Sequence, residues 1–306
     1  MRGVTKRYGT LAALSDVTFS IEQGEAVGYL GPNGSGKTTT LKLFSGLTRP
    51  DGGEVRVAGH DIRSARKMAL SKIGVLVETP GILPYVSGMD LLNHVAEVKG
   101  VPLNERPSAV NGAASSLGVK DQLGRPLGSL STGLLRRILL AAAMVGDPAI
   151  LLLDEPTLGL DPAARADLRV TLRGLHEKGT TIFLTTHLIE DVEEVCGRVL
   201  FLRDGRIAGD EAVSPVGSHE GTGRAIIVKT VDPVDLAAAT GLIGNTATAE
   251  RRSERELVIR FPGGDAAQSD ILRSLVTGGV RVVGVAPLGP DLAARYMTTV
   301  GREEAV

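Results

Sequence analysis

The feature that most constrains the fold is a glycine-rich stretch, Gly-Pro-Asn-Gly-Ser-Gly-Lys-Thr-Thr, which starts at Gly31. It matches the pattern GxxxxGK[ST] in full. The apolar run at residues 26–30 predicts a buried strand before it, and residues 38–46 have helical spacing after it. Glycines let consecutive backbone amides converge on an anion, and the helix N-terminus adds its positive dipole end. This order of strand, loop and helix predicts a cradle for the phosphates of a nucleotide.

Two side chains of this loop have distinct chemical uses. Lys37 supplies a mobile positive charge, and the hydroxyl of Thr38 suits Mg²⁺. A glycine-rich turn that merely joins a strand to a helix is the alternative, which the agreement of pattern and context disfavours. The predicted nucleotide-binding residues of the loop are Gly31, Pro32, Asn33, Gly34, Ser35, Gly36, Lys37, Thr38 and Thr39.

Composition narrows the class of protein. Lys and Arg number 34 against 35 Asp and Glu, so the net charge of -1 gives no general attraction to nucleic acid, and we expect no nucleic-acid partner. The single cysteine, Cys196, excludes an intrachain disulfide and fits a cytosolic protein. The most apolar stretches, residues 138–145 and 149–153, fall well short of the roughly 20 residues of a membrane span. The basic N-terminus lacks the apolar region of a signal peptide.

The chain length of 306 residues favours one large and one small domain. Alternation predicts a half-buried strand at residues 17–21, and the apolar runs 150–153 and 181–184 predict buried parallel strands. Residues 89–100 and 134–145 have helical patterns, which predict that the middle of the large domain is a helical insertion.

A Ser, Pro and Gly-rich composition marks the boundary between the two domains. We predict a large domain at residues 1–212, a linker at 213–224 and a small α+β domain at 225–306. Within the small domain the predicted strands are 225–230, 256–261 and 280–285, and the predicted helices are 232–240, 265–277 and 291–300.

Two adjacent carboxylates end the apolar strand Ile-Leu-Leu-Leu-Asp-Glu-Pro. Asp154 is suited to holding a water of the Mg²⁺ shell, and Glu155 to accepting a proton from a water that attacks the γ-phosphate. Acidic residues commonly cap strands, so the pair gains its meaning from the glycine loop.

These features together resemble the ATPase subunit of an ABC transporter, and the resemblance covers residues 1–209. It rests on the glycine loop, the strand end Leu-Leu-Leu-Asp-Glu-Pro-Thr, the triplet Gly-Leu-Asp that ends at Asp161, and His187 after the next predicted strand. It implies an α/β P-loop NTPase fold with a mixed β core and a helical insertion. It also implies ATP and Mg²⁺ as cofactors, and a homodimer across the ATP sites that works with a permease on a separate chain. The chain would then be cytoplasmic and peripheral to the inner face of the plasma membrane.

The same resemblance identifies a signature that acts on the nucleotide of the opposite subunit. The family usually has Leu-Ser-Gly-Gly-Gln, and here Leu-Ser-Thr-Gly-Leu occupies the place, so Thr132 and Leu134 depart from it. Ser131 and Gly133 are kept at the start of a predicted helix. Taken alone, Ser131 or Thr132 would be read as a helix N-cap.

By resemblance, His187 contacts the γ-phosphate and belongs to the catalytic set with Glu155 and Lys37. Asp161 would lie at the dimer seam, although capping the following helix is compatible with its position. Tyr8 would stack on adenine, and a packed core tyrosine is the alternative.

Glu78 is the largest departure, because the family usually has a Gln there that reaches the metal. Glu accepts hydrogen bonds as Gln does, but it adds a negative charge and donates nothing. By resemblance, the loop after Glu78 and the helical insertion form the groove for a coupling helix of the permease. A loop that packs on its own core is the alternative.

Glu78, the Ser-x-Gly signature and the small C-terminal domain occur together here. This combination is similar to that of bacterial ATPases that serve drug, antibiotic or peptide exporters of the bacitracin- and daunorubicin-resistance type. Two rival functions are an ABC-type ATPase of DNA repair or ribosomes, and a P-loop kinase for a small molecule. The first usually carries two cassettes or strongly basic surfaces, and the second needs neither Ser131 nor His187. The sequence does not identify the cargo.

Overall fold

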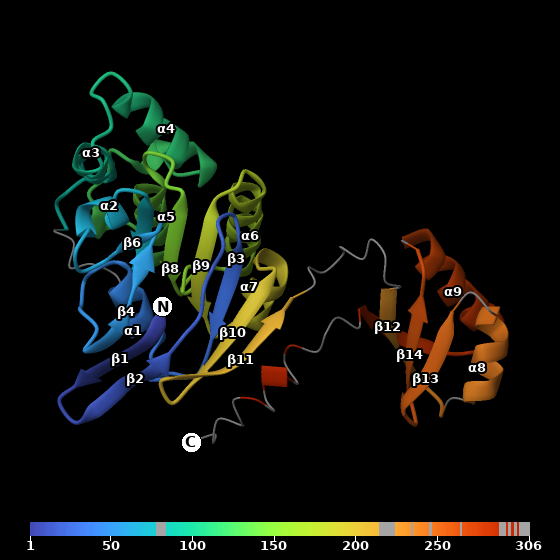
Figure 1. The fold of residues 1–306 in the computed structure, drawn as a ribbon. Helices are drawn as coiled ribbons and strands as arrows, with labels where there is room; N and C mark the ends of the chain where they lie inside the picture. Colours follow the sequence, from blue (N-terminus) through green and yellow to red (C-terminus); the bar gives the residue numbers. More distant parts are fainter. Residues whose placement is uncertain are drawn as a thin grey trace. The chain divides into compact units, whose positions relative to one another are not determined.

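The computed structural model describes residues 1–77, 84–213, 224–233, 235–244, 247–263 and 265–287, together with Leu292, Arg295, Tyr296 and Thr299. They belong to two compact units (Figure 1). Unit 1 comprises Met1–Pro215 and Arg295–Val306, and unit 2 comprises Val216–Ala294.

A six-stranded sheet in the order β11-β10-β3-β9-β8-β7 forms the centre of unit 1. The strands β10, β3, β9, β8 and β7 pair in parallel, and β11 returns antiparallel to β10. Every residue of β3 and β9 is buried, as expected for strands covered on both faces. The carboxyl ends of the parallel strands therefore meet at one edge of the sheet. The bounds are β3 Ala26–Leu30, β7 Ile73–Leu76, β8 Ile150–Asp154, β9 Thr181–Thr186, β10 Arg198–Arg203 and β11 Arg206–Ala212.

A second, antiparallel sheet has the order β2-β1-β4, and a two-stranded sheet joins β5 to β6. The strand predicted at residues 17–21 was wrong, because β2 ends at Val17. The apolar alternation there comes instead from Phe19, which is buried against Tyr29 and Phe183. The bounds are β1 Arg2–Tyr8, β2 Leu11–Val17, β4 Gly52–Glu54, β5 Arg56–Val57 and β6 His60–Asp61.

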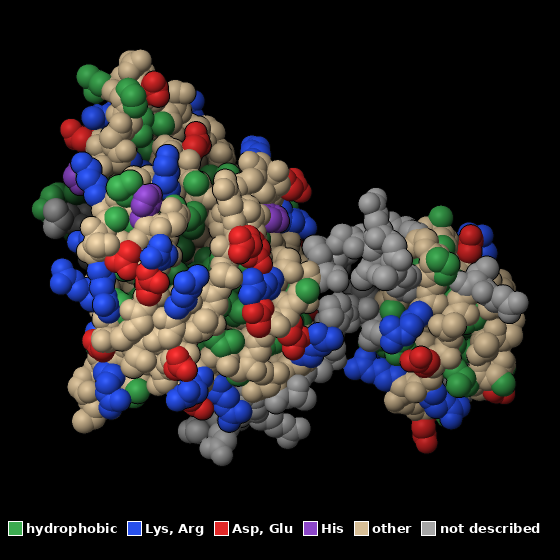
Figure 2. Space-filling view, in the orientation of Figure 1, with side chains coloured by type: hydrophobic (Ala, Val, Ile, Leu, Met, Phe, Trp, Pro, Cys, Tyr) green, Lys and Arg blue, Asp and Glu red, His purple; other side chains and the backbone are tan. Residues whose placement is uncertain are grey.

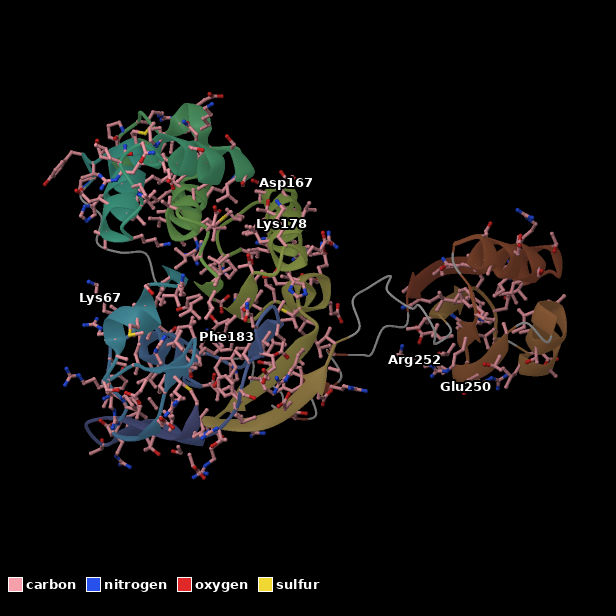
Figure 3. The ribbon with its side chains drawn as sticks, turned by 45° about the horizontal axis from the view of Figure 1, so that its top comes forward. Lys67, Asp167, Lys178, Phe183, Glu250 and Arg252 are labelled. Carbon is pink, nitrogen blue, oxygen red and sulfur yellow. The ribbon has the colours of Figure 1, made fainter. Side chains whose placement is uncertain are left out.

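Aromatic side chains concentrate in the core of unit 1, although they make up only 3% of the chain. The ring of Phe183 lies 5.2 Å from Tyr29 and 5.5 Å from Phe44, centroid to centroid. Figure 3 shows Phe183 among the side chains inside this unit. Burying such a ring contributes about 1.5–3 kcal/mol, so the cluster stabilises the packing of α1 (Lys37–Phe44) on the sheet.

The predicted helical insertion is present as α3, α4 and α5, with two short 3₁₀ helices before α5. Lys99 links the end of α3 to the end of α5, because its ammonium donates hydrogen bonds of 2.9 Å to the carbonyls of both Ala143 and Val145. No helix within the described ranges is long and apolar enough to cross a membrane. The helices of unit 1 beyond α1 are α2 Arg66–Leu70, α3 Gly88–Val98, α4 Arg106–Ser116, η1 Lys120–Gln122, η2 Leu127–Ser129, α5 Thr132–Met144, α6 Pro162–Glu177 and α7 Ile189–Val195.

Unit 2 is an α+β unit with the order β-α-β-β-α-β and an antiparallel sheet β13-β14-β12-β15. This is the ferredoxin-like arrangement. The strand β13 was not predicted, because its sequence Thr-Ala-Glu-Arg-Arg-Ser is polar and lies on an exposed edge, where Figure 3 shows Glu250 and Arg252. The bounds are β12 Arg224–Thr230, α8 Leu236–Ile243, β13 Thr248–Ser253, β14 Glu256–Phe261, α9 Asp265–Thr277 and β15 Val282–Pro287.

The chain returns to unit 1 after unit 2. Arg295 pairs with Glu211 of β11 at 2.5 Å, and the ring of Tyr296 lies 6.2 Å from that of Phe201. Residues 295–306 thus group with the large unit, whereas the sequence assigned all of 225–306 to the small domain. The predicted linker, residues 213–224, falls mostly on residues 214–223, which lie outside the described ranges.

Candidate functional site

The glycine-rich loop joins β3 to α1 at the carboxyl edge of the central sheet. Gly36 immediately precedes α1 and has φ of 111°, a conformation that only glycine adopts without strain. A Cβ atom there would lie 2.5 Å from the carbonyl oxygen of Ala13. The position therefore accepts only glycine, and the loop backbone keeps the curled path of a phosphate cradle.

Lys37 closes the mouth of this loop. Its ammonium is mostly buried and donates to the carbonyls of Gly31 at 2.5 Å and Pro32 at 3.0 Å. The buried hydroxyl of Ser35 has no hydrogen-bond partner among the described residues. A buried polar atom without a partner inside the loop fits a site that receives a polar ligand.

Asp154 ends β8 beside the first turn of α1, and its side chain is 6% exposed. The hydroxyl of Thr38 donates to one carboxylate oxygen at 2.9 Å, and the hydroxyl of Thr185 donates to the other. Hard oxygen donors of this kind suit Mg²⁺, which is usually bound by one or two carboxylates together with waters and substrate phosphates. The described residues contain no cluster of three or more His, Cys, Asp or Glu that could enclose a metal.

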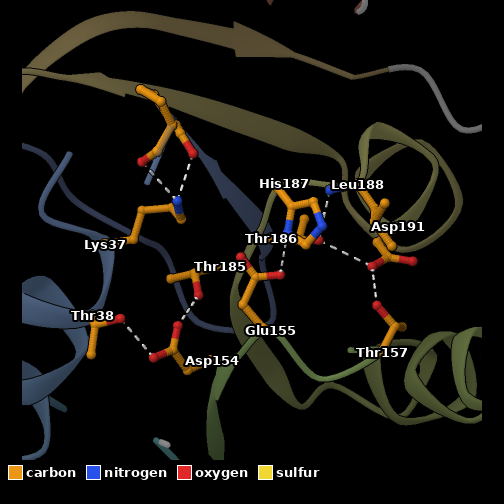
Figure 4. A network of polar contacts seen from close by, with 12 residues as sticks. Lys37, Thr38, Asp154, Glu155, Thr157, Thr185, Thr186, His187, Leu188 and Asp191 are labelled. Carbon is orange, nitrogen blue, oxygen red and sulfur yellow. Dashed lines mark hydrogen bonds and ion pairs between the residues drawn. The ribbon is translucent and has the colours of Figure 1, made fainter. Parts of the chain in front are cut away.

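Glu155 and His187 come together at the ends of neighbouring strands (Figure 4). Glu155 Oε2 lies 2.8 Å from His187 Nδ1, and the side chains are 18% and 49% exposed. Glu155 has φ of 47°, in the left-handed region. Its amide is held by a 3.0 Å hydrogen bond to the carbonyl of Thr185. The sequence singled out both residues, and the structure adds the contact between them.

Arg136 of α5 is a residue of this site that the sequence did not reveal. Its Nη2 donates to the backbone carbonyls of both Asp154 and Glu155. Burial lowers the pKa of the guanidinium. The only available signal was a pair of arginines, Arg136 and Arg137, within an otherwise apolar helix.

A buried carboxylate in α7, Asp191, was also missed. It accepts hydrogen bonds from the hydroxyls of Thr157 and Thr186, which lie close to Glu155 and His187 in the chain. Figure 4 shows these contacts beside the pair. In the sequence, Thr157 stood out only as part of the motif Leu-Leu-Leu-Asp-Glu-Pro-Thr, and no pattern pointed to Asp191.

The predicted signature lies at the start of α5. Ser131 is the N-cap, and its hydroxyl accepts from the amide of Leu134 at 3.4 Å. Ser131 and Thr132 are exposed, and Gly133 is partly exposed. These residues present the N-terminal end of a 13-residue helix to the surface.

The remaining predicted residues are spread over the surface. Asp161 caps α6 by accepting from the amide of Ala164 at 3.0 Å, and this hydrogen bond lowers the pKa of its carboxyl. Tyr8 ends β1 with 47% of its surface exposed, and Lys6 Nζ lies 5.3 Å from its ring centroid. Glu78, predicted near the metal, lies outside the described residues.

The face in Figure 2 carries Lys and Arg side chains interspersed with Asp and Glu. Such mixing matches the near-zero formal net charge. It does not form the single-sign field that steers a polyanion.

Residues 14–158 match the family model described as ABC transporter. A Bacillus subtilis protein named as an uncharacterized ABC transporter ATP-binding protein, YdbJ, is 32% identical over 99% of this chain and 96% of its own length. The Nod factor export ATP-binding protein I of Burkholderia lata is 37% identical over 67% of each chain.

Solved structures resemble the larger unit. The dimeric bacterial ABC transporter cassette MJ0796 has a TM-score of 0.65 at 26% identity, over 70% of this chain and 97% of its own. The same cassette bound to ADP and Pi after hydrolysis has a TM-score of 0.64 at 26% identity, with the same coverage. The chain therefore belongs to the ATP-binding subunits of ABC transporters, a family of ATPases.

Proposed function

We propose that Glu155 is the general base of ATP hydrolysis in this chain. The supporting observation is its 2.8 Å contact with His187, beside the carboxylate of Asp154 and the loop that contains Lys37. A carboxylate at this position can accept the proton of a water that attacks the γ-phosphate, and the imidazole fixes its orientation. His187 then senses the γ-phosphate through the same contact.

The phosphates of ATP would lie against the amides of the glycine-rich loop. Lys37 would exchange its hydrogen bonds to the carbonyls of Gly31 and Pro32 for phosphate oxygens. Tyr8 is exposed enough to stack on the adenine base. Thr38 and Asp154 would hold Mg²⁺, with Glu78 as a further candidate, and the metal would offset the charge that develops on the phosphates.

We propose that two copies enclose two ATP molecules. Each glycine loop would face Ser131, Thr132 and Gly133 of the other copy, whose exposure at a helix N-terminus suits a γ-phosphate. Asp161 would lie at the seam between the copies. The similarity to a dimeric cassette supports this arrangement.

We propose export as the direction of transport, through a permease on a separate chain that holds this subunit at the inner face of the plasma membrane. The relatives named for Nod factor export support this direction. A drug, an antibiotic or a peptide is our proposed cargo. We expect no nucleic-acid partner, because the net charge is close to zero. Membership of the transporter family argues against both rivals, the kinase and the ATPase of DNA repair or ribosomes.

The test of this function is the variant Glu155→Gln. The amide keeps the size of the side chain but loses the basic carboxylate, so we expect unchanged Mg-ATP affinity and a loss of turnover of at least 100-fold. Affinity is measured with a fluorescent ATP analogue and turnover by phosphate release. Lys37→Ala serves as the comparison, because it should lose affinity as well. Undiminished hydrolysis by Glu155→Gln would refute the role of Glu155.

A further inference from the structure

The side chain of Asp191 is the buried junction of several elements of unit 1. It lies in α7 and is 1% exposed. Its Oδ2 accepts from the hydroxyl of Thr157 at 2.6 Å and from that of Thr186 at 3.1 Å. Its Oδ1 accepts from Arg169 Nε of α6 at 2.7 Å. Both carboxylate oxygens therefore have defined partners.

The two threonines belong to the segments that carry the proposed catalytic pair. Thr157 follows Glu155 by two residues, and Thr186 immediately precedes His187. The segments thus meet at two points, directly through Glu155 and His187 and indirectly through Asp191. Because each threonine is so close in the chain to its catalytic neighbour, a shift of the backbone at either threonine also moves that neighbour.

Arg169 keeps the junction in one orientation. Its guanidinium contacts Glu194 at 2.9 Å and Glu190 at 3.6 Å as well as Asp191 at 2.7 Å. A carboxylate only accepts hydrogen bonds, so Asp191 can take both threonine hydrogens at once. Thr186 Oγ1 accepts from the amide of Leu188 at 2.9 Å, which directs its own hydrogen to Asp191.

The conformation of Glu155 gives this junction a task. Its φ of 47° is a strained conformation for a non-glycine residue, and it persists only where the surroundings hold it. The chain is held on both sides of Glu155. The strand β8 fixes the residue before it, and the hydrogen bond from Thr157 to Asp191 fixes the chain two residues after it.

We infer that Asp191 is a positioning residue, which sets the spacing between Glu155 and His187 by holding Thr157 and Thr186 together. This inference rests on the proposed roles of Glu155 and His187 in hydrolysis. It predicts that the alignment of the pair, and with it the chemical step, depends on two buried hydroxyl groups that do not themselves contact the reacting atoms.

The experiment replaces these hydroxyl groups without changing the size of the side chains. Thr157→Val and Thr186→Val keep the branched shape and leave the ion pair of Asp191 with Arg169 in place. We expect each variant to lower kcat about 10-fold, because small misplacements of catalytic groups have large effects on rate. The affinity for Mg-ATP should stay within about 2-fold, since the glycine loop is untouched. Thr157→Ser and Thr186→Ser keep the hydroxyl and should restore most of the turnover.

A further measurement separates positioning from a general loss of stability. The effects of Thr186→Val and His187→Ala should be strongly non-additive in a double-mutant cycle, because both act through the same histidine.

The control is Asp210→Asn, which disrupts the doubly hydrogen-bonded ion pair of Arg198 with Asp210 at the opposite ends of the parallel strands. It should lower the melting temperature but leave kcat unchanged. If both valine variants keep the kcat of the wild type while Glu155→Gln is inactive, the inference fails and the proposed function stands. If Glu155→Gln itself hydrolyses ATP normally, the proposed function fails.

Discussion

Arg136→Met should destabilise unit 1 and loosen the end of β8. The guanidinium donates to two backbone carbonyls, those of Asp154 and Glu155, from a partly buried position. Methionine fills much of the space but donates nothing, so both carbonyls lose their charged partner. The carbonyl of Glu155 keeps its 3.1 Å hydrogen bond from the amide of Leu158, so the main loss falls on the carbonyl of Asp154. Leaving one buried acceptor unsatisfied costs about 1–3 kcal/mol.

The cost should fall in the lower half of that range. Burial lowers the pKa of Arg136, which means that the folded protein already spends free energy on desolvating this cation. Removing the charge recovers part of that cost, so we expect a loss of about 1.5 kcal/mol. For a domain of 150–250 residues, this corresponds to a fall in Tm of about 3–6 °C.

The chain contains no tryptophan, so differential scanning calorimetry is a better assay than intrinsic fluorescence. The transition of unit 1 is identified as the one that ATP moves to higher temperature. Arg137→Met is the matched control, because Nε of both arginines is buried without a partner among the described residues, but it is Arg136 that donates to the carbonyls of Asp154 and Glu155. It should change stability by no more than about 0.5 kcal/mol. The reasoning is refuted if Arg136→Met costs less than about 1 kcal/mol, or if Arg137→Met costs as much.

Three further outcomes are expected. Gly36→Ala should lower ATP affinity more than Gly34→Ala in a binding titration. Both glycines have positive φ, but of the two only a Cβ at Gly36 would clash, at 2.5 Å from the carbonyl oxygen of Ala13. Equal affinities of the two variants would contradict this. Burial lowers the pKa of Lys99 to about 8 from 10.5, so the unfolded chain binds more protons between pH 8 and 10.5 and this lysine makes stability rise with pH there. The difference in unfolding free energy between the wild type and Lys99→Met should follow that rise, and a constant difference would exclude it. Phe183→Ala should cost about 3–5 kcal/mol in the same calorimetric assay, and a loss below 1 kcal/mol would show that the aromatic cluster is not central to the core.

Local sequence patterns predicted those strands and helices in which the spacing of apolar residues matches the spacing of buried positions. The strands at Ala26–Leu30 and Glu256–Phe261 and the helix at Asp265–Thr277 have the predicted bounds. The prediction failed where a buried residue is not in a paired strand, or where a paired strand is not buried. Phe19 made a non-strand segment look like a strand, and the polar edge strand β13 carries no apolar alternation.

The sequence by itself determined the glycine-rich loop that we propose as the phosphate cradle, because its glycines, Lys37 and Thr38 are close together in the chain and their spacing already dictates the loop. It also supplied Glu155 and His187 as separate candidates. Only the tertiary structure brought these two within 2.8 Å and placed Arg136 and Asp191 behind them. The reason is physical: those contacts join residues from different strands and helices, and parallel strand pairing, which no local pattern encodes, decides which strand ends become neighbours.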